Sequence, residues 1–148
     1  MTYTYKISGD DFGSAGAASS DIKKKLRQLG LPVSLIKRSA IAMYEAEINM
    51  VIHAGGGITA IIIDSDRIVI EFIDKGPGIS DINLAMTEGW STATDKARSL
   101  GFGAGMGLPN IERNVHHLQI ESEPGKGTTL RMTLDIGVSD RKCSNARK

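Results

Sequence analysis

The sequence contains very little cysteine. Among its 148 residues there is one, Cys143, in a polar segment near the C-terminus. A single cysteine excludes an intrachain disulfide and a metal site built from several thiolates. Long hydrophobic runs are also missing, which excludes a membrane-spanning helix, and the first six residues, Met-Thr-Tyr-Thr-Tyr-Lys, lack the features of a signal peptide. We therefore expect a cytoplasmic protein that does not associate with a membrane.

An excess of charge of either sign is absent as well. The 18 Lys and Arg residues almost balance the 17 Asp and Glu residues, so that the formal net charge is +1. This balance does not indicate a nucleic-acid partner. Glycine, by contrast, is abundant, with 17 residues. Many of them fall in three short clusters, and this clustering is the most informative feature of the composition.

The segment 33–54 has the clearest helical pattern in the chain. Its apolar residues cover most of the circumference, which is typical of a buried helix. Glu45, Asn49 and His53 are spaced by four and form one polar stripe along it, and Arg38 falls near the same stripe. A buried carboxylate and amide are costly unless something pairs with them. We therefore expect the stripe to face a ligand.

Other segments show strand or helix periodicity. We predict strands at 2–8, 58–63, 67–73, 118–123 and 128–136. We predict further helices at 14–29, 81–88 and 108–118, and Ser34 as the N-cap of the central helix. Short polar turns join the second strand to the third and the fourth to the fifth, so both pairs are expected to be antiparallel hairpins.

This order of elements predicts an α/β sandwich, in which helices cover one face of a mixed, largely antiparallel sheet. One domain would span residues 1–136, and 137–148 would be a flexible polar tail. Residues 89–107 show no periodicity and are predicted to form a long loop. A loop of this length in a small domain is uncommon unless it is functional or disordered.

The second of the glycine clusters, Gly101–Gly107, has glycine at every other position. Glycine allows positive φ, so the backbone amides of such a segment can point toward one place. The cluster also leads directly into a predicted helix, and amide nests and helix N-termini both bind phosphate well. The spacing matches neither a Walker loop nor the Rossmann fingerprint. A flexible hinge without a ligand remains an alternative.

The first cluster begins with Asp74, where an apolar strand ends. Its carboxylate can accept a hydrogen bond from a ligand amino group, and Gly76 and Gly78 would let a flat ring approach the backbone. The alternative is an aspartate that caps its own turn, which is common and which the residues alone favour. Likewise, Gly127 and Thr128 in the third cluster are by themselves typical of a hairpin turn.

Glu45 and Asn49 supply a carboxylate and an amide oxygen one helical turn apart. The carboxylate can act as a general base, and oxygen ligands suit Mg²⁺, which keeps waters and phosphate oxygens in its shell. His53, near the predicted helix end, is more typical of a packing or capping residue.

Together these motifs resemble those of the GHKL ATPase superfamily, the gyrase, histidine-kinase and MutL-like ATP-binding fold. Glu45-x-x-x-Asn49 resembles its N box. The three glycine segments resemble its glycine boxes, namely Asp74-x-Gly76-x-Gly78, Gly103-Ala-Gly-Met-Gly107-Leu and Gly125-Lys-Gly127-Thr128. Each motif alone is weak, but all four occur in the order found in that superfamily.

Within the superfamily, the chain is most similar to the small anti-sigma-factor-type serine/threonine kinases, and among them to the switch kinase of the bacterial stressosome pathway. The similarity includes Glu88-Gly-Trp-Ser-Thr92 and Gly107-Leu-Pro109. No phosphoacceptor-histidine hairpin and no transducer domain is recognisable, so a sensor histidine kinase or a complete gyrase-like enzyme is not expected. The segment Ala93–Leu100 is longer than expected for a switch kinase, which leaves loop closure and partner choice open.

The resemblance implies ATP and Mg²⁺ as cofactors. It implies that Asp74 binds the adenine amino group with support from Thr128, that Asn49 ligates Mg²⁺, and that Glu45 accepts the proton of a serine or threonine hydroxyl or orients water. The remaining nucleotide-binding residues that it implies are Gly76, Gly78, Gly101, Gly103, Gly105, Met106, Gly107 and Leu108.

The implied substrate is a STAS-domain antagonist protein in a sigma-factor switch. The alternative is a nucleotide-controlled anti-sigma or switch protein with little kinase activity, whose partner is a sigma factor or a regulatory phosphatase. A homodimer is compatible with either interpretation. A third interpretation, a structural domain whose glycine boxes are only turns, would make four ordered motifs a coincidence.

Overall fold

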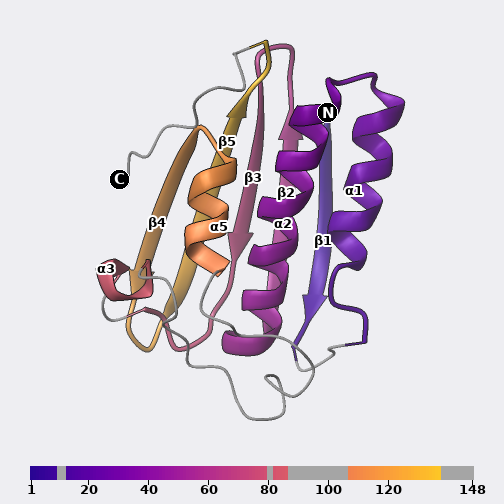
Figure 1. Ribbon diagram of the computed structural model, residues 1–148. Helices are drawn as coiled ribbons and strands as arrows, with labels where there is room; N and C mark the ends of the chain where they lie inside the picture. The colour runs from indigo at the N-terminus through magenta and orange to yellow at the C-terminus, as the bar shows by residue number, and fades with distance from the viewer. Residues whose placement is uncertain (10–12, 80–81, 87–106, 138–148) are drawn as a thin grey trace.

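The computed structural model describes residues 1–9, 13–79, 82–86 and 107–137. The described strands form one sheet in the order β1-β2-β3-β5-β4, and each neighbouring pair is antiparallel (Figure 1). The strands are β1 (Thr2–Ser8), β2 (Gly56–Ile63), β3 (Arg67–Ile73), β4 (His117–Glu123) and β5 (Gly127–Asp135). The helices are α1 (Ala17–Gln28), α2 (Val33–His53), α3 (Ile82–Ala85) and α5 (Gly107–Asn114). The predicted α/β sandwich is confirmed, with a described sheet that is antiparallel throughout.

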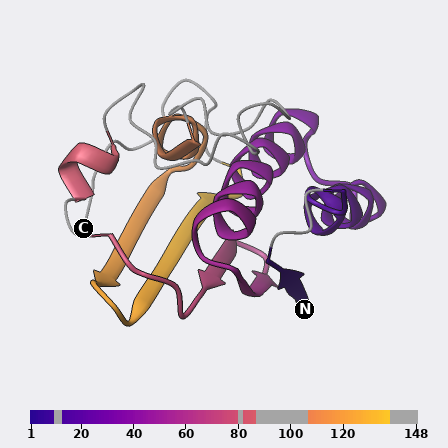
Figure 2. The ribbon, with the colours of Figure 1, turned by 90° about the horizontal axis from the view of Figure 1, so that it is seen from below.

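The helices α1, α2 and α5 lie on the same face of the sheet (Figure 2). Period-two alternation gives each strand one apolar face toward them, as in β3, where Ile68, Ile70 and Phe72 are buried. The long helix α2 covers the middle of the sheet and packs against α1 on one side and α5 on the other. The largest fully buried aliphatic side chains of the sheet are Ile61, Ile68, Ile70, Leu118, Met132 and Leu134. Burying one such side chain contributes about 1.5–3 kcal/mol, so this layer holds α2 in place.

Several predicted boundaries shift. The helix predicted at 108–118 is α5, which ends at Asn114, because Leu118 belongs to β4 and pairs with Met132 of β5. The predicted N-cap Ser34 is wrong, since Pro32 occupies the N-cap and α2 has no side-chain cap. The strand predicted at 58–63 begins earlier, at Gly56, because its first two glycines continue the pairing with β1. Within the described residues, no helix has both the length and the hydrophobicity needed to cross a membrane.

The buried carboxylate of α2 belongs to Glu47, which is 2% exposed. Its oxygens accept hydrogen bonds from the backbone N–H groups of Gly16 (2.9 Å), Ala18 (3.2 Å) and Ser19 (3.0 Å). These groups lie at the start of α1, where helix N–H groups lack partners within the helix and where the helix dipole favours a negative charge. Glu47 therefore caps α1 from a neighbouring helix.

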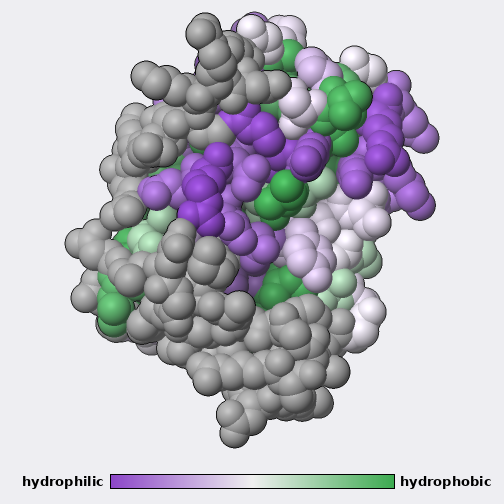
Figure 3. All heavy atoms as spheres, viewed as in Figure 1, coloured by the Kyte–Doolittle hydropathy of each residue, from purple (hydrophilic) through white to green (hydrophobic). Residues whose placement is uncertain are grey.

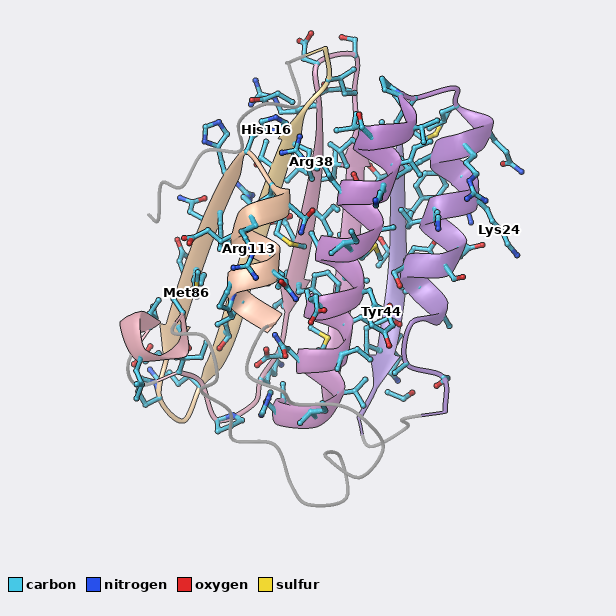
Figure 4. The ribbon with its side chains drawn as sticks, in the orientation of Figure 1. Lys24, Arg38, Tyr44, Met86, Arg113 and His116 are labelled. Atoms are coloured by element: carbon cyan, nitrogen blue, oxygen red, sulfur yellow. The ribbon has the colours of Figure 1, made fainter. Side chains whose placement is uncertain are left out.

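The start of α1 lies close to α2, and a glycine at position 16 permits this. The N-cap of α1 is Gly16, with φ 96° and no side-chain hydrogen bond. A Cβ at this position would lie 2.9 Å from the ring of Tyr44, which sits between α2 and the start of α1 (Figure 4). The expectation that the stripe from Glu45 to His53 carries the buried carboxylate was therefore wrong. Its members are half-buried. Glu47 is buried instead, because hydrogen bonds from backbone N–H groups offset the free-energy cost of removing its carboxylate from water.

Candidate functional site

Two consecutive turns of α5 contact the polar stripe of α2. A Cβ on Gly107, the first residue of α5, would lie 2.8 Å from Nδ2 and 3.0 Å from Oδ1 of Asn49. One turn later, Asn110 Nδ2 lies 3.5 Å from Glu45 Oε1. The two helices therefore run in opposite directions, and Glu45 and Asn49 of the stripe both face α5. A side chain at position 107 would displace the asparagine amide, so the glycine lets Asn49 keep this position.

Asp74 lies directly after β3 and is held in place by the backbone around it. Its Oδ1 accepts hydrogen bonds from the N–H groups of Gly76 (2.9 Å) and Thr128 (3.2 Å). Its own N–H donates to the carbonyl oxygen of Thr128 at 3.0 Å. The aspartate is thus a turn cap, as the residues alone favoured. Both side-chain hydrogen bonds end on Oδ1, so they orient the carboxylate without using Oδ2.

Thr128 is connected to Asp74 through its backbone, and its hydroxyl has a different partner. Its Oγ1 lies 2.8 Å from the hydroxyl of Ser122, its cross-strand neighbour on β4. The same serine accepts a hydrogen bond from the N–H of Ile79 at 2.6 Å. Ser122 was missed by sequence reasoning, although the register of the last hairpin would have placed it opposite Thr128. It ties the first glycine segment to the third.

Three glycines of the first and third boxes, Gly76, Gly78 and Gly127, allow backbone segments to approach one another. A Cβ on Gly76 would lie 2.7 Å from Cα of Ala54, at the end of α2. A Cβ on Gly78 would lie 2.4 Å from the carbonyl oxygen of Glu123, and one on Gly127 2.2 Å from that of Asp74. Gly78 and Gly127 also have positive φ values of 76° and 129°, which disfavour other residues. Close packing, rather than space for a ring, is the reason that the structure gives for these glycines.

Other predicted site residues have mixed outcomes. Leu108 is half-buried and packs against the core. Gly101, Gly103, Gly105 and Met106 lie outside the described residues, as do Glu88–Thr92 and Ala93–Leu100. Within the described part of the chain, no three His, Cys, Asp or Glu residues are arranged to hold a metal ion. Hydrophilic side chains gather over α5 and the adjoining side of α2, and again over α1 (Figure 3).

His53, the last residue of α2, is half-buried, and burial lowers its pKa below the usual 6.5. Since the unfolded chain then binds a proton more readily than the folded chain, stability should fall as the pH drops below about 6.5 toward the lowered pKa. We expect His53→Gln to lose less stability than the wild type between pH values of about 7.5 and 5.5, as measured by urea unfolding at each pH. The matched control is His117→Gln, at a half-exposed histidine. If the two variants lose stability equally, burial of His53 does not contribute to the pH dependence.

Residues 35–138 match the family described as histidine kinase-, DNA gyrase B-, and HSP90-like ATPase. The chain is 38% identical over 116 residues to an anti-sigma F factor of Caldanaerobacter subterraneus subsp. tengcongensis, which covers 74% of this chain and 77% of that protein. It is 32% identical over 111 residues to the serine/threonine-protein kinase RsbT of Bacillus subtilis, and the alignment covers 71% of this chain and 76% of RsbT. Among solved structures, the mycobacterial sensor histidine kinase MprB aligns with a TM-score of 0.53 over 92% of this chain and 98% of that chain. At 14% identity, this last likeness supports the fold alone.

Proposed function

Because the chain belongs to the histidine kinase-, DNA gyrase B- and HSP90-like ATPase family, we propose that it binds ATP with Mg²⁺ and transfers the γ-phosphate to a protein serine or threonine. The observation that carries this proposal is that Glu45 and Asn49, one helical turn apart, face two consecutive turns of α5, with Asn49 beside its first residue. This arrangement supports a site in which Asn49 ligates the magnesium ion beside a helix N-terminus, a favourable place for phosphate oxygens, and Glu45 acts as the base one turn further along.

The proposal assigns roles in holding ATP to site residues at the end of β3, at the start of β5 and on α2. Asp74 accepts a hydrogen bond from the adenine amino group through Oδ2, while Gly76 and Thr128 fix its Oδ1. The amide oxygen of Asn49 suits Mg²⁺, which commonly takes one or two protein ligands and completes its shell with phosphate oxygens and waters. When bound, the ion neutralises charge that develops on the phosphates.

The second glycine segment would hold the phosphates. Gly107 begins α5 beside Asn49, and Leu108 follows it in the same first turn. The proposal extends this amide cradle to Gly101, Gly103, Gly105 and Met106, which precede it in the sequence. Phosphoryl transfer depends mostly on positioning and on charge neutralisation, so a site of this size is sufficient.

We propose a STAS-domain antagonist protein as the substrate. Relatives of this chain carry the names anti-sigma F factor and serine/threonine-protein kinase, which together support a switch that controls a sigma factor. The direct test is transfer of radiolabelled phosphate from ATP to any STAS-domain protein encoded near this gene. Absence of transfer to every such neighbour would contradict the kinase assignment.

Asp74→Asn tests the ATP site without disturbing the fold. Asparagine keeps an acceptor at Oδ1 for the two backbone N–H groups, but it replaces Oδ2 with a donor that cannot accept from the adenine amino group. For the wild type we expect ATP at about 100 times its dissociation constant to raise the free energy of unfolding by about 2.7 kcal/mol. The variant should lose most of this gain in a thermal-shift assay with Mg²⁺ and ATP.

The matched control for this variant is Asp66→Asn, which makes the same chemical change in the turn before β3, at the far end of that strand from Asp74. This control should keep the full ATP-dependent shift. An undiminished shift in Asp74→Asn would overturn the adenine assignment, and the absence of a shift in the wild type would overturn ATP binding.

A second candidate function is a nucleotide-controlled binding protein with little kinase activity. It is favoured by the name anti-sigma F factor on the relative that is 38% identical. The partner would then be a sigma factor or a regulatory phosphatase, bound by one copy of the chain or by a homodimer. Co-precipitation of the partner with ATP, with ADP and without nucleotide tests this function, and a complex that is indifferent to nucleotide would exclude it.

A further inference from the structure

We propose that Asn110 and Arg113 on α5 are positioning residues for Glu45, and that they form a hydrogen-bonded relay from the protein surface to the base. This inference rests on the proposed function, and it adds two residues that the family motifs do not include. The relay consists of Arg113 Nη2 donating to Asn110 Oδ1 at 2.6 Å, and Asn110 Nδ2 donating to Glu45 Oε1 at 3.5 Å.

The arginine determines which way the amide of Asn110 points. A guanidinium group has hydrogen-bond donors and no acceptor, so the amide atom beside Arg113 must be the oxygen. The amide nitrogen then faces Glu45 and presents a donor to it. A flipped amide would place its oxygen against the carboxylate, where two acceptors repel. Arg113 therefore fixes the one orientation in which Asn110 supports a carboxylate.

The spacing on α5 suits this role. Asn110 and Arg113 are three residues apart on one side of the helix, where side chains are neighbours. Figure 4 shows Arg113 on α5, the helix that packs against α2. The side chain of Asn114 donates to the backbone carbonyl oxygen of Asn110 at 2.7 Å. Since Gly107 contacts Asn49 one turn earlier, a single rigid helix holds both the phosphate end of the site and the base.

The contact to Glu45 is long for a hydrogen bond. Catalytic hydrogen bonds are often long before substrate binds and tighten in the complex. Glu45 and Asn110 are both half-buried. Water therefore competes for the carboxylate and weakens this hydrogen bond, but the bond still favours one orientation of the carboxylate. Hydrogen bonds in a chain polarise one another, so the charge of Arg113 strengthens the donor that faces Glu45.

Four variants of the full chain test the relay. Asn110→Ala removes it, Arg113→Leu removes the group that orients it, and Arg113→Gln keeps a donor for Asn110 Oδ1. Arg27→Leu makes the same change at an exposed arginine of α1 and controls for loss of a surface charge. Misplacing a catalytic group by about 1 Å can cost about a hundredfold in rate. At saturating ATP and STAS-domain protein, we expect transfer to fall by about tenfold to a hundredfold in Asn110→Ala and in Arg113→Leu. Arg113→Gln should restore most of the rate, and Arg27→Leu should not change it.

A purely structural role would not produce this pattern. We expect the KM for the protein substrate, the dissociation constant for ATP and the urea midpoint to remain near the wild-type values while kcat falls. Loss of kcat together with stability, or an Arg113→Gln variant as slow as Arg113→Leu, would overturn the positioning role. Wild-type rates in Asn110→Ala would overturn it as well.

A second measurement is independent of catalysis. In ¹⁵N-labelled protein without ligand, the side-chain amide signals of Asn110 should move as Glu45 is titrated. This movement should disappear in Glu45→Gln and weaken in Arg113→Leu. If the Asn110 amide does not respond to Glu45, the relay is absent and the inference fails even if the protein is a kinase. If the wild type transfers no phosphate, the proposed function fails instead, and the amide response separates the two failures.

Discussion

Glu47→Ala should lower the free energy of unfolding by about 3–5 kcal/mol, because it leaves the N–H groups of Gly16, Ala18 and Ser19 without their acceptor, and each buried, unsatisfied donor costs about 1–3 kcal/mol. The N–H groups of Ala18 and Ser19 are the more deeply buried, so water cannot readily replace the carboxylate there. The negative charge beside the start of α1 is lost as well.

Urea denaturation checks this expectation, with the midpoint and the slope fitted together. Glu47→Gln is the intermediate variant, because glutamine keeps one oxygen but turns an N–H₂ group toward the backbone donors. Glu47→Gln should lose less stability than Glu47→Ala. It should therefore remain folded even if the alanine variant unfolds. Hydrogen exchange should show the loss most strongly at α1. A change below about 0.5 kcal/mol, the usual effect of a surface substitution, would mean that Glu47 does not cap this helix.

Glu45→Gln should have the opposite profile, with catalysis lost and stability kept. A general base contributes about 10²- to 10⁴-fold to a rate, and we expect single-turnover transfer from ATP to the STAS-domain protein to fall by about that factor. Glutamine keeps the size of the side chain and an oxygen that can accept from Asn110, so the contact with α5 is retained. Glu45 is half-buried, and its replacement should leave the urea midpoint almost unchanged.

Binding of ATP should also survive in Glu45→Gln, since the carboxylate is not assigned to hold the nucleotide. The control is therefore the ATP-dependent thermal shift, which should match that of the wild type. Transfer at the wild-type rate would show that Glu45 is not the base, whereas a lost thermal shift would show that it helps to hold ATP. Neither result is expected for a carboxylate that acts only on the hydroxyl of the substrate.

The sequence was sufficient to predict the arrangement of strands and helices, because alternation and helical spacing are local properties. Ile68, Ile70 and Phe72 alternate in a way that only a half-buried strand explains, and β3 has the predicted bounds. Leu118 was harder to assign, because it fits both the helical spacing of the preceding residues and the alternation of β4. Because Leu118 fits the helical period, the predicted helix extended to it, whereas α5 ends at Asn114.

The identity of the buried carboxylate could not be predicted in the same way. Glu45 and Glu47 lie two residues apart in one apolar helix, and their spacing says nothing about which neighbour each one faces. The partners of Glu47 are backbone amides, which no side-chain pattern marks. Asp74 shows the same limit in part. The N–H of Gly76 belongs to the turn that the residues alone favoured, whereas the N–H of Thr128, the second donor to its Oδ1, depends on the fold.

The close approaches at Gly76, Gly78 and Gly127 have a consequence for how such sequences diverge. A Cβ at any of them would collide with the backbone or with Ala54, so selection for folding alone keeps glycine there. Under the proposed function, a descendant that no longer binds nucleotide would still conserve these three glycines, while Asn49 would be released to drift and Asp74 would need only to keep an acceptor at Oδ1, as asparagine does. Intact glycine boxes would then persist in an inactive homologue, and only the aspartate and the asparagine would distinguish it from an active one.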